Sequence, residues 1–219
     1  MVDLKRLYDM RFTQAGTAKR AAVWKVLCSS FFSKLIPADA TVLDIACGYG
    51  EFINNIRAGA KYAVDLNRDS PAHLNPDVNF HATSALDLSG LPQGAFDVAF
   101  TSNFLEHFHD KKELDTLFGE VLKLLKPGGR FIVIGPNIRF AYREYWDYYD
   151  HYLPLSDLSL TEGLQLAGFT VERVVPRFLP YTMQGRTPTA DFLIKAYLKL
   201  PFAWRFMGKQ FLVIARKPA

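Results

Sequence analysis

The sequence predicts a doubly wound α/β domain, in which helices cover both faces of a mostly parallel sheet. Short apolar segments alternate with helical patterns along the chain, and a glycine-rich turn follows the first of these segments. The chain has 219 residues, of which 49% are hydrophobic, and this is enough for one domain with a sizeable core. We therefore expect a single domain over residues 1–219.

Seven apolar segments are expected to form the strands of the sheet. Most are apolar on both faces instead of strictly alternating, which is typical of parallel strands that helices bury on each side. They cover residues 41–46, 62–66, 78–82, 96–101, 130–135, 169–175 and 210–217.

Helical periodicity, with apolar residues three and four positions apart, marks four other segments. They cover residues 4–36, 111–126, about 158–167 and about 190–200, and Pro37, Pro127 and Gly168 end the first three. We divide the chain accordingly into an N-terminal helical cap (1–36), a core (37–175) and an insertion before the last strand (176–208).

The net charge of +4 conceals an uneven distribution along the chain. Basic minus acidic residues give 7 − 2 = +5 for residues 1–34, 10 − 18 = −8 for residues 35–170 and 9 − 2 = +7 for residues 171–219. The basic ends are compatible with simple solubility or with attraction to an anionic substrate or membrane surface.

Two further features bear on location and on metal binding. No stretch approaches the ~18 consecutive apolar residues of a membrane span, and the first residues lack the apolar core of a signal peptide, so we expect a cytoplasmic protein. Cys28 and Cys47 show no spacing suited to zinc. We therefore expect neither a disulfide nor a metal.

The chemistry is indicated by the turn after the first strand, which runs from Asp44 to Phe52 and contains Gly48 and Gly50. Glycines permit a tight turn and close approach of a ligand, and a helix is expected to follow with its N-terminal amides aimed at the same place. Asp65 ends the second strand 65 − 44 = 21 residues after Asp44, where the Rossmann pattern has the carboxylate that binds ribose hydroxyls. A ribose-bearing cofactor is implied.

The same turn indicates which cofactor. A dinucleotide fingerprint starting at Gly48 needs a third glycine at position 53, but that residue is Ile53. Asp44 would repel a pyrophosphate, whereas it suits a ligand with a positively charged amino group. S-adenosylmethionine has that group, so a nicotinamide-dependent oxidoreductase is disfavoured.

Four motifs in order resemble those of the class I S-adenosylmethionine-dependent methyltransferases, over about residues 40–175. They are VLDIACGYGEF, AVDLN, FDVAFTSNFLEHF and LKPGGRFIVIGPN. The resemblance implies a Rossmann-like seven-stranded sheet whose last strand is antiparallel, with N-terminal helices, and transfer of a methyl group from S-adenosylmethionine to an acceptor.

The resemblance also implies roles for single residues. Around the methionine moiety, the ribose and the adenine it places Asp44, Ala46, Cys47, Gly48, Gly50, Asp65, Leu66, Ser84, Ala85 and Asn103. Ala46 stands where a glycine is usual, which is tolerable if its φ stays negative. Ser84 replaces an acidic residue and accepts a hydrogen bond from the adenine more weakly. Tyr8 and Arg11 are expected to close over the cofactor.

Two histidines are the candidate catalytic bases, since an oxygen or nitrogen acceptor must lose a proton. His107 follows the fourth strand, and His151 lies beside Asp150 in an aromatic segment after the fifth strand. The alternatives are that His107 only starts a helix and that the aromatic segment only covers the sheet edge. Rings with polar tips suit a saccharide or another small molecule as acceptor.

Other functions stay open or are disfavoured. A module that binds the cofactor without turnover is the main rival to an enzyme. A nucleic-acid methyltransferase is disfavoured, because no recognition domain is appended. Within the insertion at 176–208, basic residues alternate with aromatic ones, and Leu193, Ala196, Tyr197 and Leu200 form a core-like stripe. The insertion therefore either packs on the sheet or contacts a lipid-linked acceptor or a membrane surface peripherally.

Overall fold

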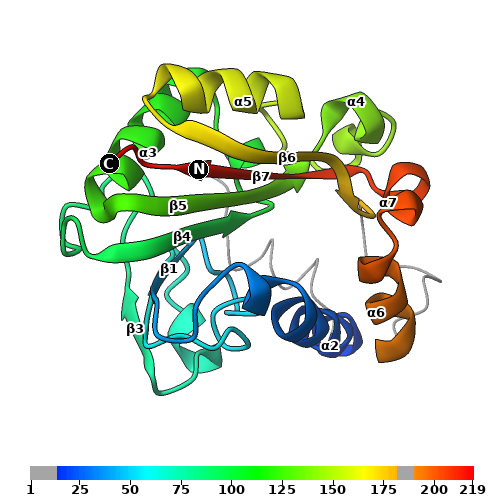
Figure 1. Cartoon of the computed structure of the whole chain (residues 1–219), viewed down its shortest axis with the longest axis horizontal. Helices are drawn as coiled ribbons and strands as arrows, with labels where there is room; N and C mark the ends of the chain where they lie inside the picture. The colour runs from blue at the N-terminus through cyan, green and yellow to red at the C-terminus, as the bar shows by residue number, and fades with distance from the viewer. Residues whose placement is uncertain (1–13, 182–189) are drawn as a thin grey trace.

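The computed structural model describes residues 14–181 and 190–219, which form one seven-stranded sheet with helices on both faces (Figure 1). The strands lie in the order β3-β2-β1-β4-β5-β7-β6. Their bounds are β1 Thr41–Ile45, β2 Ala60–Val64, β3 Val78–His81, β4 Phe96–Ser102, β5 Leu125–Pro136, β6 Thr170–Leu179 and β7 Gln210–Arg216.

The pairing of the strands confirms the predicted fold class. Strands β1 to β5 pair in parallel, whereas β7 is antiparallel to both of its neighbours, β5 and β6. From β1 the chain builds outward to β3 and then crosses back to β4 on the other side of β1. The carboxyl ends of β1 and β4 therefore flank the switch point where open α/β sheets bind ligands.

Two hydrophobic layers attach the helices to the sheet. On one face, α3 (Lys111–Leu124) and α5 (Asp157–Leu166) bury side chains such as Phe118 and Leu164. On the other face lie α2 (Gln14–Ser30), α6 (Asp191–Lys199) and α7 (Pro201–Met207), whose anchors include Leu27 and Trp204 (Figure 1). Thus α2 and the C-terminal helices, distant in sequence, cover the same side of the sheet.

Short elements fill the connections; all except η1 (Phe32–Lys34), which lies between α2 and β1, follow the carboxyl end of a strand. The α-helical turn α4 (Ile138–Ala141) follows β5. The other 3-10 turns are η2 (Ser70–His73), η3 (Leu105–His107) and η4 (Tyr145–Asp147). Of these, η3 and η4 carry or adjoin the two candidate catalytic histidines.

Several predicted boundaries were wrong. The segment after Gly50 forms turns and no α-helix, and the side chain of Asn54 is engaged there with the backbone of His73 and Asn75 instead. Strand β5 starts five residues before the predicted 130, because the backbone of Leu125 pairs with Phe96.

The insertion before the last strand also differs from the prediction. It contains a second helix, α7, because Pro201 starts a new helix after ending α6. Of the expected stripe only Tyr197 packs inward; Leu193 and Leu200 are exposed, and Ile194 and Leu198 take their place. Within residues 14–181 and 190–219, no helix is both long and apolar enough to cross a bilayer.

Candidate active site

A cavity of about 190 Å³ opens at the carboxyl ends of β1 and β4, at the switch point of the sheet. Five of the residues predicted to bind cofactor line it: Asp44, Ala46, Cys47, Gly48 and Asn103. The cavity is therefore built by the loops that follow two neighbouring strands.

The backbone of the glycine turn is left-handed at three positions. The φ angles are +57° at Ala46, +56° at Gly48 and +75° at Gly50. A Cβ atom on Gly50 would come within 2.4 Å of Leu74 Cδ2, which is the movable end of a side chain, so the positive φ is the main reason that this position favours glycine. The condition under which alanine is tolerable at position 46, a negative φ, is not met, so Ala46 adopts a conformation that favours glycine.

Asp44 lies at the end of β1 with its side chain buried in the cavity wall. Burial raises the pKa of this carboxyl well above its usual range, and the nearby carboxylates of Glu51 and Asp65 raise it further. A cationic group in the cavity would offset this unfavourable charge. The arrangement thus fits the amino group of an S-adenosylmethionine methionine moiety.

Asp65 follows β2 directly and ties two loops together. Its Oδ2 accepts a hydrogen bond from the backbone N–H of Gly48, and its Oδ1 accepts one from Asn67, both at 2.7 Å. Burial raises the pKa of Asp65, against the lowering effect of these backbone N–H groups. Each carboxylate oxygen has two lone-pair sites, so Asp65 retains acceptor capacity for ribose hydroxyls.

The remaining predicted cofactor residues lie outside the cavity. Gly50, Asp65, Leu66, Ser84 and Ala85 are not part of its wall, so the cavity includes only about half of the predicted cofactor residues. Leu66 is 60% exposed and is therefore accessible to an adenine ring, whereas Ala85 is buried in the core. Ser84 Oγ accepts a hydrogen bond from the backbone N–H of Leu86.

Sequence reasoning missed the part of the wall that α2 supplies. Arg20 and Trp24 line the cavity, and Arg20 Nη2 lies 2.6 Å from Glu51 Oε1. Trp24 packs edge-on against Phe52 and Phe100, which line the cavity as well. The signal was the i, i+4 spacing of Arg20 and Trp24 on one helix face. Tyr8 and Arg11, which were expected to close over the site, lie outside the described residues.

A second polar cluster brings together the two candidate bases from segments 44 residues apart. The rings of His107 and His151 lie 5.1 Å apart, edge to face. His107 Nδ1 is 2.9 Å from the backbone oxygen of Asp150 and 3.2 Å from its Oδ2. Ligand-type atoms of Glu106, His107 and His151 all lie within 4.8 Å of one another.

The environment of this cluster is buried and negatively charged. Burial opposes protonation of His107, but the hydrogen bond with Asp150 and the charges of Glu106 and Asp150 outweigh it and raise the pKa of His107. Burial also raises the pKa of Tyr145 and of Tyr181, and the charge of Glu106 adds to both effects. Tyr148 stacks on His151 at 4.8 Å, so aromatic rings hold that imidazole in place.

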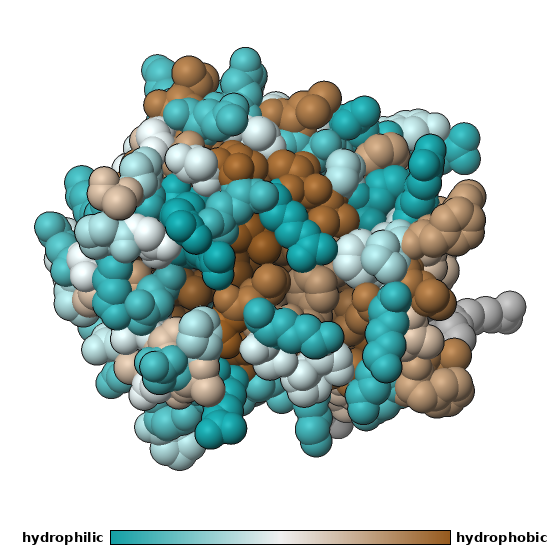
Figure 2. Space-filling view, viewed as in Figure 1, coloured by the Kyte–Doolittle hydropathy of each residue, from teal (hydrophilic) through white to brown (hydrophobic). Residues whose placement is uncertain are grey.

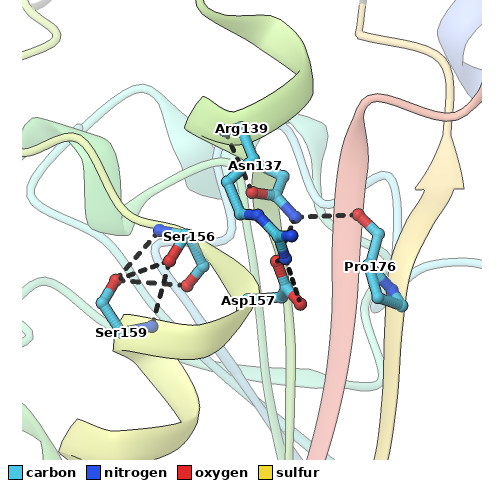
Figure 3. Close-up of polar contacts among 6 residues, drawn as sticks. All are labelled: Asn137, Arg139, Ser156, Asp157, Ser159 and Pro176. Atoms are coloured by element: carbon cyan, nitrogen blue, oxygen red, sulfur yellow. Dashed lines mark hydrogen bonds and ion pairs between the residues drawn. The ribbon is translucent and has the colours of Figure 1, made fainter.

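A polar junction anchors both ends of the segment that carries His151 (Figure 3). The buried Asn137 donates from Nδ2 to Asp157 Oδ1 at 2.7 Å and to the backbone oxygen of Pro176 at 2.9 Å. Arg139 pairs with the same Asp157, and Ser156 and Ser159 form the capping box of α5. The loop between Asn137 and Asp157 is therefore fixed to β5, β6 and α5.

Comparison with known families decides which class of α/β protein this is. The methyltransferase domain family matches residues 18–174, which is more than half of the chain. The chain belongs to this family. It is a class I S-adenosylmethionine-dependent methyltransferase, and S-adenosylmethionine is its cofactor.

Solved structures show the same fold as this methyltransferase. An S-adenosylmethionine-dependent methyltransferase from Archaeoglobus fulgidus has a TM-score of 0.66 and 21% identity, covering 90% of this chain and 94% of its own. One from Mesorhizobium loti has a TM-score of 0.62 and 18% identity, covering 88% and 98%. The N-methyltransferase NodS from Bradyrhizobium japonicum has a TM-score of 0.57 and 16% identity, covering 93% and 96%. None of the curated proteins matches the sequence.

Proposed function

We propose that this methyltransferase holds the methionine end of S-adenosylmethionine between Asp44 and the glycine turn, with the ribose at Asp65. Asp44 pairs with the amino group, and the backbone at Gly48 allows close approach. The observation that carries this proposal is the buried Asp44 carboxylate in the cavity wall, because a buried carboxylate is unfavourable until a cation reaches it.

The chain contributes mainly position and exclusion of water. When bound, S-adenosylmethionine supplies an electrophilic methyl group on a sulfonium sulfur. Asn103, whose φ is +51°, lines the cavity at the end of β4 and is three residues before Glu106. The loop after β4 therefore connects the cofactor cavity to the histidine cluster. Holding donor and acceptor in line is the main source of rate in such a displacement.

We place the acceptor's oxygen or nitrogen at the cluster of His107 and His151. When no metal ion is bound, a ring nitrogen of one histidine can take the proton that the acceptor loses. Asp150 holds His107, and Tyr145, Tyr148 and Tyr181 surround His151. These rings with hydroxyl tips suit a small polar acceptor such as a saccharide.

An apolar surface on the C-terminal helices favours a lipid-linked acceptor. Its members are Phe192, Leu193, Leu200, Phe202, Phe206 and Met207, each at least 40% exposed. Figure 2 shows hydrophobic side chains gathered at the right-hand edge, where Figure 1 places α6 and α7. The opposite sides of these helices are also apolar, since Leu198 and Trp204 are buried in the core.

Basic residues lie among these exposed apolar ones. Lys195, Lys199 and Arg205 are on the same two helices. Aromatic side chains with interspersed Lys and Arg are the composition of surfaces that lie on anionic membranes. We therefore propose peripheral contact with an anionic membrane as the route by which a lipid-linked acceptor reaches the site. A cytoplasmic location stays a prediction.

Turnover tests the proposed function. Purified chain and methyl-labelled S-adenosylmethionine are incubated with monosaccharides, with lipid-linked saccharides in vesicles and with small amines. We expect label in a saccharide fraction, greatest for the lipid-linked one, and none with Asp44→Asn. Label in no acceptor, together with tight cofactor binding, would instead support a binding module without turnover.

A further inference from the structure

The cluster at His107 and His151 has the composition of a metal site. One carboxylate and two imidazoles offer ligand atoms that all lie within 4.8 Å of one another. Glu106 and His151 are buried, and His107 is partly buried. One carboxylate and two histidines form the ligand set of many catalytic zinc sites, which leave a coordination position open for water or substrate.

The partners of His107 match those that metal-binding histidines have. His107 Nδ1 lies against the backbone oxygen and the Oδ2 of Asp150, at 2.9 and 3.2 Å. His151 Nδ1 lies 3.4 Å from the hydroxyl of Tyr181. A histidine that donates from one ring nitrogen to a carboxylate or carbonyl leaves the other nitrogen as a more basic ligand. In His107 this nitrogen is Nε2, whereas His151 Nδ1 has a phenol hydroxyl as its partner.

The backbone fixes the ligands against each other. The backbone oxygen of Glu106 accepts hydrogen bonds from Tyr152 at 2.9 Å and Leu153 at 3.1 Å, the two residues that follow His151. The hydroxyl of Tyr145 donates to the backbone oxygen of Leu153 at 2.7 Å. Gln210 Nε2 donates to the backbone oxygens of Pro180 and Tyr181, which places Tyr181 beside the cluster. The ligands are therefore preorganised by three segments.

We infer that Glu106, His107 and His151 bind one divalent transition-metal ion of the Zn²⁺ type. Zn–N bonds of about 2.1 Å in a tetrahedron put ligand atoms roughly 3.4 Å apart, so small side-chain rotations complete the site. Two nitrogen ligands favour Zn²⁺, or its substitute Co²⁺, over Mg²⁺, which prefers oxygen. This site departs from the sequence-based expectation of no metal, which rested on the cysteines alone.

The use of the ion in methyl transfer rests on the proposed function, whereas its binding does not. A ligated ring nitrogen has no free lone pair for a proton, so with the ion bound neither histidine serves as base through its ligating nitrogen. The ion instead holds the acceptor oxygen and lowers its pKa, and the proton leaves to water. The metal ion thereby activates the acceptor, a role that an imidazole has when no metal is bound.

Binding of Co²⁺ and Zn²⁺ to the metal-stripped chain tests the inference directly. We expect one ion per chain, visible Co²⁺ absorption bands of a four- or five-coordinate site, and displacement of Co²⁺ by Zn²⁺. His107→Gln and His151→Gln should each weaken Zn²⁺ binding by more than the ~10–100-fold typical for loss of an outer partner, and Asp150→Asn by that amount. His109→Gln is the matched control, because His109 is exposed in the same loop and outside the cluster.

Two readouts keep the outcomes distinct. Each variant is first checked for S-adenosylhomocysteine binding, which shows that the fold is intact. Stoichiometric binding that is lost in the two histidine variants and kept in His109→Gln supports the site, even if no methyl transfer is found. Failure of Co²⁺ and Zn²⁺ to bind the intact chain, or equal binding by all variants, overturns it. Methyl transfer that persists in metal-stripped chain would then leave the histidine base in place.

Discussion

Asp65 Oδ2 accepts a hydrogen bond from the backbone N–H of Gly48 at 2.7 Å, so one carboxylate joins the end of β2 to the glycine turn after β1. The residue expected to bind the ribose therefore also shapes the loop that approaches the methionine moiety. Its other oxygen fixes the backbone of Asn67. Cofactor binding and loop geometry are thus coupled through a single side chain.

Replacing Asp65 with Ala should weaken S-adenosylhomocysteine binding by ~1–3 kcal/mol, because charge-assisted hydrogen bonds are lost. The same change should lower the melting temperature, since the N–H groups of Gly48 and Asn67 lose their acceptor. Calorimetry and thermal unfolding measure the two effects. Asp87→Ala is the control, because Asp87 is exposed and outside the cavity; an equal loss in both variants would contradict the assigned role.

Replacing Asp44 with Asn should stabilise the cofactor-free protein at neutral pH while it weakens cofactor binding. The buried carboxyl has a raised pKa, so keeping it ionised opposes folding. Asparagine removes that charge but no longer pairs with the cofactor's amino group. Thermal unfolding without cofactor and calorimetry with S-adenosylhomocysteine should therefore change in opposite directions.

The pH dependence of unfolding gives the sign of this effect. A carboxyl whose folded pKa lies above its unfolded value binds protons more tightly in the folded state. Its contribution is favourable below about pH 4 and is lost as the pH rises through the folded pKa. The free energy of unfolding of Asp44→Asn, relative to the wild type, should increase over that window. If this difference in the free energy of unfolding does not change with pH, the pKa of Asp44 is not raised in the folded protein.

Replacing Ala46 with Gly should stabilise the protein, by up to ~1 kcal/mol. At φ +57° an L-residue is strained, and glycine relieves the strain at some loss of backbone entropy in the unfolded chain. Ala72→Gly, in the exposed 3-10 turn at Ser70–His73, carries the same entropy loss without strain relief and should destabilise. Denaturant unfolding compares the two variants; destabilisation by both would refute a left-handed Ala46.

Phe202→Ser and Phe206→Ser should reduce flotation of the protein with anionic phosphatidylglycerol vesicles. Both rings are exposed on α7, and their centroids lie 4.8 Å apart. Binding of the wild type should weaken as salt is raised, because the Debye length shortens and the basic residues lose their attraction. Leu166→Ser, at the exposed end of α5 on the other face of the sheet, is the control and should float like the wild type.

Much of the fold was predictable because strands that are buried on both faces appear in the sequence as short runs of apolar residues. The segment at 41–46 correctly predicted β1, and the turn that follows it contains Gly48 and Gly50 as expected. A helix was expected after Gly50 because one usually follows such a glycine turn, but the segment forms turns, and the side chain of Asn54 binds a loop 19 residues away. The second helix α7 was missed because Pro201 reads equally well as a stop and a start.

The candidate site could be predicted only where its residues are close together in the sequence. His107 and His151 were each named as candidates, but their approach depends on the Glu106 backbone and on the junction at Asn137, which sequence spacing does not encode. Arg20 was missed because its helix, α2, was expected only to pack against the core and not to line the cavity. The conformation of Ala46 was also beyond reach, because nothing local distinguishes a strained alanine from a relaxed one.

Calorimetric titration of the purified chain with S-adenosylhomocysteine and, separately, with NAD tests most directly that the cavity beside Asp44 holds the methyl donor. We predict micromolar binding of S-adenosylhomocysteine, about −8 kcal/mol, that is lost with Asp44→Asn, and no comparable binding of NAD. Tighter binding of NAD, or S-adenosylhomocysteine binding that is unchanged by Asp44→Asn and Asp65→Ala, would contradict the assignment.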